Sequence, residues 1–378
     1  MSNFQDVTAF LDDIASWLIP GADCIIYQDG KQVYRHQTGY ADVETKTPIA
    51  PGMLFNMYSA TKLSTCTAVM QLLERGKFLL SDPVAAYLPE FSDMAVACKI
   101  EGKEEIIRAK RPVTVGHLLS MTAGLDYELD TPEVQAVRER TGGTCPTREV
   151  VKAIAKRPLS FEPGTHWQYS LCHDVLGALV EEVSGQRFGA YLREHIFEPA
   201  GMCHTGFERN AEIEASMASQ YEYDEAAKCY KNVGKSNRFR LGSEYESGGA
   251  GLISCADDYV LLVNALCNGG VAATGERILS RAAIDLMRTN QLDAVALQDF
   301  DWPHLVGYGY GLGVRTMIDK AKSGSLGPVG EFGWDGAAGV YMLIDPENRL
   351  AVFYMQHMLN GQHPYIHPRL RNIVYQCL

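Results

Sequence analysis

Several features that mark particular compartments or chemistries are missing from this 378-residue sequence. Its first six residues lack the basic segment and apolar core of a secretory signal. No apolar run reaches the roughly 18 residues of a membrane-spanning helix. The 10 cysteines are scattered without a Cys-x-x-Cys pair, which favours reduced thiols over disulfides or a zinc site. We therefore expect a cytoplasmic protein.

Positive charge is also scarce, because the formal net charge is −12. Binding to phosphates requires clustered lysine and arginine, so we expect neither nucleic acid nor a membrane as partner. Hydrophobic residues at 46% and charged residues at 21% are typical of an ordinary globular protein. The length allows one large core or two lobes, and it predicts no particular oligomeric state.

Motifs of several enzyme classes are absent as well. The sequence has no Gly-x-Ser-x-Gly and no His-Glu-x-x-His. Alternating glycines from Gly307 to Gly313 suit a strand that another backbone approaches closely, but they form no dinucleotide-binding Gly-x-Gly-x-x-Gly. Pro364 lies between His363 and His367, and no third ligand is evident, which predicts a plain surface segment. We expect no metal and no cofactor.

Both ends of the chain are rich in β-prone segments. Asp29-Gly30 separates 24–27 from 32–35, which is a strong hairpin signal. Further strands are expected at 308–314, 329–332, 340–344 and 350–355, and a closing helix at 370–377. Periodic apolar residues predict helices at 7–18, 115–119, 150–154, 176–183, 188–196 and 256–267, with one small hairpin near 100–107.

This order of elements predicts an α/β fold of the α+β type. An antiparallel sheet formed by both termini, flanked by helices, would occupy 1–78 and 190–378 as one discontinuous domain. The segment 79–189 would form an inserted, mainly helical lobe. A cleft between the two would be the default site for a ligand.

Ser59 and Lys62 stand three residues apart at the start of a helical segment that runs to Glu74. Side chains at positions i and i+3 share one helix face, here with the apolar stripe that includes Leu63 and Cys66. A lysine directed into a core is costly unless it has a partner or a function. Ser-x-x-Lys arises about once or twice by chance in a chain of this length, so the pair alone favours a capped helix start over catalysis.

A serine hydroxyl becomes a useful nucleophile only when a base removes its proton. Lys62 can act as that base if burial and a neighbour lower its pKa toward neutrality. A tyrosine hydroxyl beside the lysine could share the proton and pass it to the leaving group. Acyl transfer also needs two backbone N–H donors for the developing oxyanion, one of which a serine at a helix N-terminus supplies.

Four further segments occur in an order that carries a family resemblance. They are VTVGHLLSMTAGL at 113–125, PGTHWQYS at 163–170, SGGAGL at 247–252 and GWDGAAG at 333–339. Together with the Ser-x-x-Lys they resemble the serine β-lactamase and penicillin-binding-protein superfamily, closest to the class C-like family VIII carboxylesterases. The resemblance covers nearly the whole chain and implies a β-lactamase/transpeptidase-like fold.

The same resemblance implies roles for individual residues. Ser59 would be the acylated nucleophile, with Lys62 and Tyr169 as base and proton shuttle. The N–H groups of Ser59 and Ala337 would form the oxyanion hole, with Ala337 on a strand edge after Gly336.

Two positions depart from the family pattern and bear on the substrate. Leu171 stands where the tyrosine motif usually has an asparagine that contacts a substrate amide, and Trp334 replaces the lysine that binds a substrate carboxylate. An indole can pack on an acyl or alcohol group but cannot pair with a carboxylate. We therefore expect Trp334, Leu171, Gly336 and Tyr127 to contact a neutral ester. Tyr127 belongs to the acidic segment 126–143, which we expect to be a lid or pocket wall.

These observations predict a serine hydrolase that cleaves small or medium carboxylic esters through an acyl-Ser59 intermediate. Three alternatives remain open at this point: β-lactamase or D-amino-acid peptidase or amidase activity, acyl transfer to an alcohol or amine, and a non-catalytic ligand sensor on the same fold.

Overall fold

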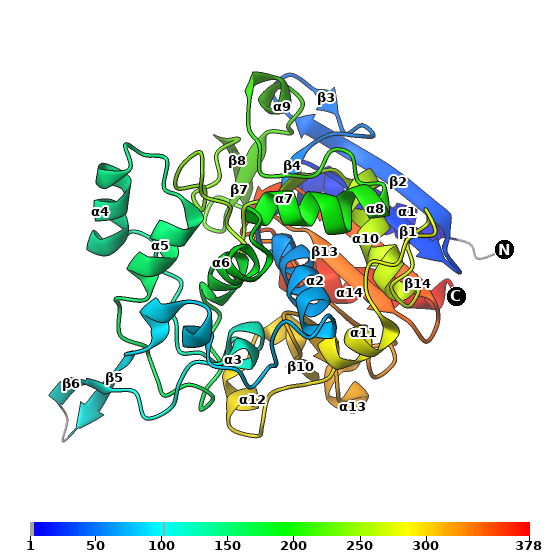
Figure 1. Cartoon of the computed structure of the whole chain (residues 1–378). Coiled ribbons are helices and arrows are strands. Elements are labelled where there is room, and N and C mark those ends of the chain that lie inside the picture. The colour runs from blue at the N-terminus through cyan, green and yellow to red at the C-terminus, as the bar shows by residue number, and fades with distance from the viewer. Residues whose placement is uncertain (1–3, 101–102) are drawn as a thin grey trace.

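Strands from both ends of the chain form one antiparallel sheet (Figure 1). The computed structural model describes residues 4–100 and 103–378. The blue N-terminal strands lie beside the orange and red C-terminal strands in Figure 1. In spatial order the eight strands are β10 (Tyr308–Tyr310), β11 (Arg315–Met317), β12 (Phe332–Gly333), β13 (Tyr341–Asp345), β14 (Leu350–Gln356), β1 (Gly21–Gln28), β2 (Lys31–Asp42) and β3 (Thr47–Pro48). The predicted fold class is confirmed.

Two hairpins of this sheet follow directly from local turn chemistry. Asp29 and Gly30 join β1 to β2 with φ of 54° and 73°, the positive values that a type I′ turn requires. Between β13 and β14, the Asp345 carboxylate accepts hydrogen bonds from the N–H groups of Glu347 (2.9 Å) and Asn348 (3.2 Å). Both predicted hairpins are confirmed.

The expected strand at 308–314 is wrong, because the chain turns within it. Gly311 donates its N–H to the carbonyl of Val314 at 2.8 Å, and Gly313 has a φ of 84°. Only glycine adopts such a φ without strain, so the alternating glycines mark the turn of the β10–β11 hairpin instead of a continuous strand.

Helices cover both faces of the sheet. Successive residues of a strand point to opposite faces, and Ile26 accordingly packs with the terminal helices α1 (Gln5–Trp17) and α14 (His363–Gln376). Its neighbour Ile25 belongs to the main core, which includes α10 (Ala256–Cys267) on the other face. The predicted helix at 256–267 is confirmed, and the central strands β1, β13 and β14 form a buried layer.

The prediction of a surface segment around His363 and His367 is wrong. Both residues belong to α14, which begins seven residues before the helix expected at 370, and His367 is buried. Pro364 is compatible with this helix, because it lies in the first turn. The N–H groups of a first turn have no acceptor within the helix, so the N–H that proline lacks costs no hydrogen bond there.

The remaining elements lie mostly in the middle of the chain, and Figure 1 shows α4, α5 and the β5–β6 hairpin projecting to one side. The turn of the predicted hairpin falls on 101–102, outside the described residues. The helix α4 was not expected from the sequence. The helices are α2 (Thr61–Glu74), α3 (Val115–Leu119), α4 (Pro132–Arg140), α5 (Thr147–Ile154), α6 (Cys172–Ser184), α7 (Phe188–Leu192), α8 (Glu198–Ala200), α9 (Ala211–Ala215), α11 (Arg281–Met287), α12 (Ala296–Asp299) and α13 (Lys320–Ser323). The strands are β4 (Phe55–Asn56), β5 (Ala95–Ile100), β6 (Lys103–Arg108), β7 (Gln220–Asp224), β8 (Cys229–Gly234), β9 (Ile253–Ser254) and β15 (Met358–Leu359).

The domain boundaries predicted from the sequence stay a prediction. No helix within the described ranges is both long and apolar enough to cross a membrane.

The helix α2 is more deeply buried than the expected one-sided stripe. Twelve of its 14 residues, Thr61 to Leu72, are buried. Its polar side chains are satisfied internally: Thr65 donates to the carbonyl of Gly248 at 2.6 Å, and Gln71 donates to that of Ile278 at 2.7 Å. Hydrogen bonding on several sides therefore allows α2 to run through the core.

Candidate active site

The segment before α2 sets the direction of Ser59. Tyr58 has a φ of 46°, a left-handed conformation that is uncommon for any residue other than glycine. Tyr58 also begins a 3₁₀ turn, Tyr58–Ala60, that leads into α2. Such strain costs of order 1–3 kcal/mol and persists only where the surroundings impose it. The backbone therefore bends sharply just before the predicted nucleophile.

Lys62 is fully buried and uses all three of its N–H donors. It donates to Ser59 Oγ at 3.2 Å, to the hydroxyl of Tyr127 at 3.2 Å and to the carbonyl of Gly249 at 2.7 Å. The predicted pair Ser59 and Lys62 thus lies within hydrogen-bond distance. Tyr169 approaches the ammonium group through its ring, whose centroid is 4.5 Å from Nζ.

The pKa of Lys62 is set by opposing effects of its surroundings. Burial alone lowers the pKa of Lys62, but interactions with Tyr127, Tyr169 and Asp174 outweigh it, so the net pKa is raised above its ordinary value. The pKa lowered toward neutrality, which was the condition for Lys62 to act as a base in the free site, is therefore not found. The sequence indicates that the Lys62 side chain faces the core. It does not indicate how many hydrogen-bond acceptors surround the ammonium group there.

Two tyrosines stack beside the lysine. The rings of Tyr127 and Tyr169 are nearly parallel, at 7°, with centroids 5.2 Å apart. The hydroxyl of Tyr169 accepts a hydrogen bond from Trp334 Nε1 at 3.3 Å. Trp334 itself is buried, and therefore its indole holds the tyrosine hydroxyl in place. Tyr127 was expected only as a substrate contact, and its contact with Lys62 has no sequence motif.

An aromatic wall surrounds Tyr169 and Trp334. Trp302 lies 5.3 Å from Tyr169 and 5.8 Å from Trp334 between ring centroids, and Tyr310 lies 5.0 Å from Trp334. The contacts of Trp302 with Tyr169 and of Tyr310 with Trp334 are edge-on, and that of Trp302 with Trp334 is tilted. Aromatic pairs in such arrangements are favourable and hold rings in fixed orientations. The sequence analysis missed Trp302 and Tyr310, because they are distant along the chain from every motif.

The glycine-rich segment 247–251 closes the other side of Lys62. Asp174 on α6 accepts hydrogen bonds from the hydroxyl groups of Tyr245 (2.7 Å) and Ser247 (2.6 Å). Burial raises the pKa of Asp174, while these hydrogen bonds oppose that rise. A Cβ on Gly249 would meet Asp174 Oδ2 at 2.6 Å, so the segment fits only without a side chain there. Asp174 was not singled out from the sequence.

Ala337 and Gly336 lie in a turn, not on the expected strand edge, because β12 ends at Gly333. Gly336 packs against the segment before Ser59, since a Cβ on it would meet the carbonyl of Met57 at 2.7 Å. The N–H of Ala337 donates to no acceptor in the described part of the chain. A free donor suits an oxyanion hole, and the role itself stays a prediction.

Leu171 is buried and its N–H donates to the carbonyl of Asp126 at 2.9 Å. It forms the start of α6 and is not among the residues of the pocket described next. The structure therefore gives Leu171 a packing position, and its predicted contact with substrate stays untested.

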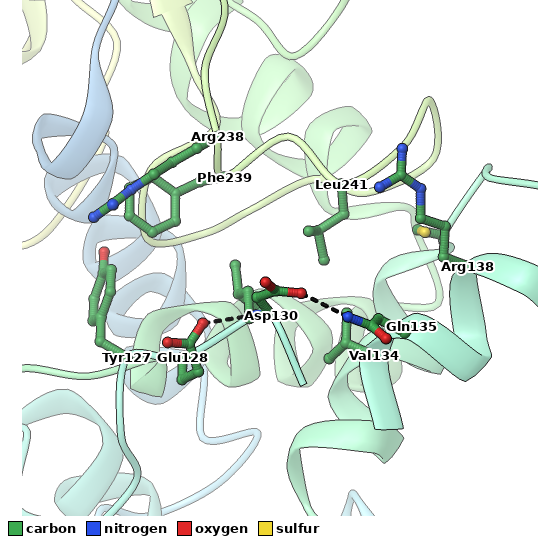
Figure 2. Close-up of a pocket in the computed structure, with 11 residues that line it drawn as sticks. Tyr127, Glu128, Asp130, Val134, Gln135, Arg138, Arg238, Phe239 and Leu241 are labelled. Carbon is green, nitrogen blue, oxygen red and sulfur yellow. Dashed lines mark hydrogen bonds between the residues drawn. The ribbon is translucent and has the colours of Figure 1, made fainter. Parts of the chain in front are cut away.

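A pocket of about 460 Å³ lies beside Tyr127 (Figure 2). Its walls come from the segment 127–138, which includes part of α4, and from the loop 238–241. Phe239 packs edge-on against Tyr127, with centroids 5.3 Å apart. Figure 2 shows the guanidinium groups of Arg138 and Arg238 at opposite ends of this pocket. The segment 126–143 thus forms a pocket wall.

One group of potential metal ligands occurs among the described residues, away from Ser59. His204, Cys255 and Asp258 bring one ligand atom each to within 4.8 Å of one another. The Asp258 carboxylate already accepts hydrogen bonds from the N–H of His204 and from Thr205 Oγ1 at 3.0 Å. These contacts give the group a structural role, because Asp258 on α10 anchors the turn at residues 204–205.

Comparison with known proteins gives a consistent result. The family model described as Beta-lactamase matches residues 12–374. Protein Rv1367c of Mycobacterium tuberculosis is 33% identical over 349 residues, which cover 90% of this chain and 86% of that protein. Esterase EstB of Burkholderia gladioli is 30% identical over 379 residues, which cover 94% of this chain and 90% of the esterase.

A solved structure is similar over nearly its full length. EstCE1, described as a hydrolase with promiscuous acyltransferase activity, superimposes with a TM-score of 0.80 at 27% identity. The match covers 98% of this chain and 98% of that one.

Proposed function

The chain belongs to the β-lactamase family, and from this premise we propose that it is a serine esterase that hydrolyses small or medium carboxylic esters through an acyl-Ser59 intermediate. The superfamily resemblance and its esterase relatives are confirmed by the family match, and serine hydrolase or acyltransferase chemistry is the broad activity they support. Within the family we propose the class C-like family VIII carboxylesterases as the nearest group, and the cytoplasm as the compartment.

The observation that carries the proposal is the contact of Lys62 Nζ with Ser59 Oγ at 3.2 Å in a fully buried setting. After Lys62 loses a proton, its amine can accept the proton of the Ser59 hydroxyl as Oγ attacks the ester carbonyl. A tetrahedral oxyanion forms, and the N–H groups of Ser59 and Ala337 are our candidates for its donors.

Collapse of this intermediate breaks the bond to the alcohol. The leaving oxygen needs a proton, and Tyr169 can donate its own while it regains one from Lys62. Water then attacks the acyl group on Ser59, and the same groups remove a proton from the water and return one to Ser59. The net reaction converts ester and water into acid and alcohol, and requires no cofactor.

The size of the pocket beside Tyr127 is an argument for a substrate ester of modest size. Its volume of about 460 Å³ is in the range of small-ligand sites. Apolar side chains, including Leu129, Val134 and Phe239, line it and suit an acyl or alcohol chain. The indole at Trp334 is engaged with Tyr169, so no cation stands at that position to pair with a substrate carboxylate.

The proposal is tested with purified protein and p-nitrophenyl butyrate, where we expect hydrolysis by the native chain and loss of at least a thousandfold in kcat for Ser59→Ala. Labelling by a fluorophosphonate probe, located on Ser59 by mass spectrometry, gives a second readout. Unchanged activity or labelling in Ser59→Ala contradicts the proposal. Turnover of nitrocefin as fast as the aryl ester favours a β-lactamase instead.

Acyl transfer is a second candidate, favoured by the description of EstCE1. The acyl-Ser59 intermediate reacts with an alcohol in the same way as with water, if the alcohol reaches the site. Product analysis of the aryl ester reaction with added alcohols distinguishes the two, because only transfer yields a new ester. Formation of acid alone, across a series of alcohols, counts against this candidate.

A further inference from the structure

A second cavity, of about 730 Å³, is separate from the pocket beside Tyr127. Its walls come from α7, the loop 203–210, α9 and the loop 240–246, and none of Ser59, Lys62, Tyr127 or Tyr169 lines it. We call it the arginine pocket, because Arg187, Arg193, Arg209 and Arg240 all line it. No step of ester hydrolysis at Ser59 requires this cavity.

The charge of the arginine pocket is opposite to that of the whole chain. Its lining holds four arginines and two glutamates, a balance of +2, while the chain carries −12. Three of the arginines have carboxylate partners: Arg187 with Glu246 at 3.2 Å, Arg193 with Glu198 at 3.7 Å, and Arg209 with Glu214 at 2.7 Å. The exception is Arg240.

Arg240 lacks an ion-pair partner within the described ranges. One of its nitrogens donates to the carbonyl of Phe207 at 3.1 Å, and no described carboxylate lies at ion-pair distance. Burial, and then the charge of Arg209, lowers the pKa of Arg240, while the charge of Glu214 opposes this only in part. Two guanidinium groups that act on one another in a half-buried setting favour a bound anion between them.

The floor of the same cavity is apolar. Phe207 and Ile213 are partly exposed and form its accessible apolar side, and Leu54 and Ile253, which also line the cavity, are already buried. A cavity of about 730 Å³ is much larger than an inorganic anion needs, and a hydrocarbon chain gains stability by covering such a floor. The lining thus combines a cationic side with an apolar one.

We propose that the arginine pocket binds an organic carboxylate with a medium-length hydrocarbon chain, whose carboxylate pairs with Arg240 beside Arg209 and whose chain covers Phe207 and Ile213. The acid released by hydrolysis of a medium-chain ester belongs to this class. The inference goes beyond the proposed function, because binding here does not depend on any reaction at Ser59.

Octanoate is the probe, and isothermal titration calorimetry on the Ser59→Ala protein is the measurement. We expect saturable binding of octanoate, no detectable binding of the uncharged octanamide at the same concentration, and a Kd at least tenfold weaker in Arg240→Gln. Arg209→Gln is a second variant, expected to weaken binding several-fold. Thermal unfolding of each variant shows whether it is folded.

The matched control is Arg281→Gln on α11, which removes an equal charge from a side chain that is 85% exposed and does not line the pocket. It should leave the Kd for octanoate unchanged. Unaltered octanoate binding in both Arg240→Gln and Arg209→Gln overturns the proposal, and so does octanamide binding as tight as that of octanoate. Displacement of octanoate by equimolar inorganic phosphate overturns the assignment to a carboxylate.

Discussion

At the scale of single residues, the central feature is that Lys62 contacts two hydroxyl groups and one carbonyl. Its contact with Ser59 was expected, but the second hydroxyl belongs to Tyr127, while Tyr169 offers its ring and holds its own hydroxyl against Trp334. The two tyrosines therefore hold different positions around one ammonium group. Tyr127 is near the proton on Lys62, and Tyr169 is next to the aromatic wall.

Removal of the Tyr127 hydroxyl tests this arrangement. Tyr127→Phe keeps the ring that stacks on Tyr169 but loses the acceptor for Lys62, so we expect kcat for p-nitrophenyl butyrate to fall about tenfold to a hundredfold with KM little changed. Tyr169→Phe should lose about a hundredfold or more, because it removes the proposed donor to the leaving group. Steady-state kinetics measure both.

A matched control is Tyr230→Phe on β8, which removes a phenolic hydroxyl far from Lys62 and should leave kcat unchanged. If Tyr127→Phe instead raises KM with kcat intact, Tyr127 contributes to substrate binding alone, as first expected from the sequence.

The raised pKa of Lys62 predicts how kcat/KM for ester hydrolysis depends on pH. The free site holds an ammonium ion, because the net pKa of Lys62 is raised, whereas general-base action needs the amine. The active fraction therefore grows as pH rises, and we expect kcat/KM to increase about tenfold per pH unit between pH 7 and 9. A plateau that begins below pH 7.5, in protein shown by circular dichroism to be folded throughout, contradicts this charge state.

The residues of the site differ in how far the sequence could reveal them. The spacing of Ser59 and Lys62 already indicates that they meet, since it depends only on helix geometry. Tyr127 is 65 residues from Lys62 along the chain, and only the tertiary fold brings its hydroxyl into contact. The direction of the pKa shift of Lys62 could not be derived from the sequence for the same reason, because it depends on the sum of such contacts.

At the scale of elements, the glycine-rich segment 247–251 explains why α2 can carry a buried lysine. Its carbonyl at Gly249 accepts a hydrogen bond from Lys62, and its Ser247 is fastened to Asp174 on α6. Helix, glycine segment and α6 therefore meet around one ammonium group. Any change that moves the glycine segment should alter Lys62 before it alters the rest of the core.

Gly249→Ala tests that dependence. The new Cβ would lie 2.6 Å from Asp174 Oδ2, closer than real Cβ contacts, so either the segment or the Asp174 carboxylate must shift, and both are part of the surroundings of Lys62. We expect kcat to fall at least tenfold and the thermal midpoint to drop by several degrees, as is typical for overpacking by about 1–3 kcal/mol. Gly206→Ala is the control, because its nearest contact would be 4.0 Å away. Equal behaviour of the two variants would contradict the tight fit.

Elements with local signals were predicted well, and those decided by distant contacts were not. The hairpin at Asp29-Gly30 and the helix Ala256–Cys267 depend on turn chemistry and periodicity, which the sequence displays directly. The β10–β11 hairpin was mistaken for one strand, because alternating glycines are compatible with both. The start of α14 at His363 was missed, because proline in a first turn resembles a helix boundary.

At the scale of the whole molecule, the central strands β1, β13 and β14 of the sheet are buried on both faces, so several ionisable side chains are enclosed with them. His357, just after β14, is buried at 3% exposure and packs edge-on against Phe55. Burial lowers the pKa of His357 from 6.5 to about 4. The folded protein thus keeps this imidazole neutral at a pH where the unfolded chain protonates it.

The linkage between proton binding and folding determines how the lowered pKa of His357 changes the free energy of unfolding with pH. Above pH 6.5 neither state binds the proton, and the free energy of unfolding is unaffected. As pH falls from 6.5 toward 4, only the unfolded chain gains the proton, and the folded state loses about 1.4 kcal/mol per pH unit from this residue. Between pH 8 and pH 5 the loss amounts to about 2 kcal/mol.

The variant His357→Leu removes the contribution of His357 to the pH dependence of the free energy of unfolding. The contributions of buried carboxylates are the same in the native protein and the variant, so they cancel in the comparison. Urea unfolding at pH 8 and pH 5 should show that the native protein loses about 2 kcal/mol more than the variant over that interval. Parallel losses in the native protein and His357→Leu would mean that His357 is protonated in the folded state, which the enclosed sheet does not allow.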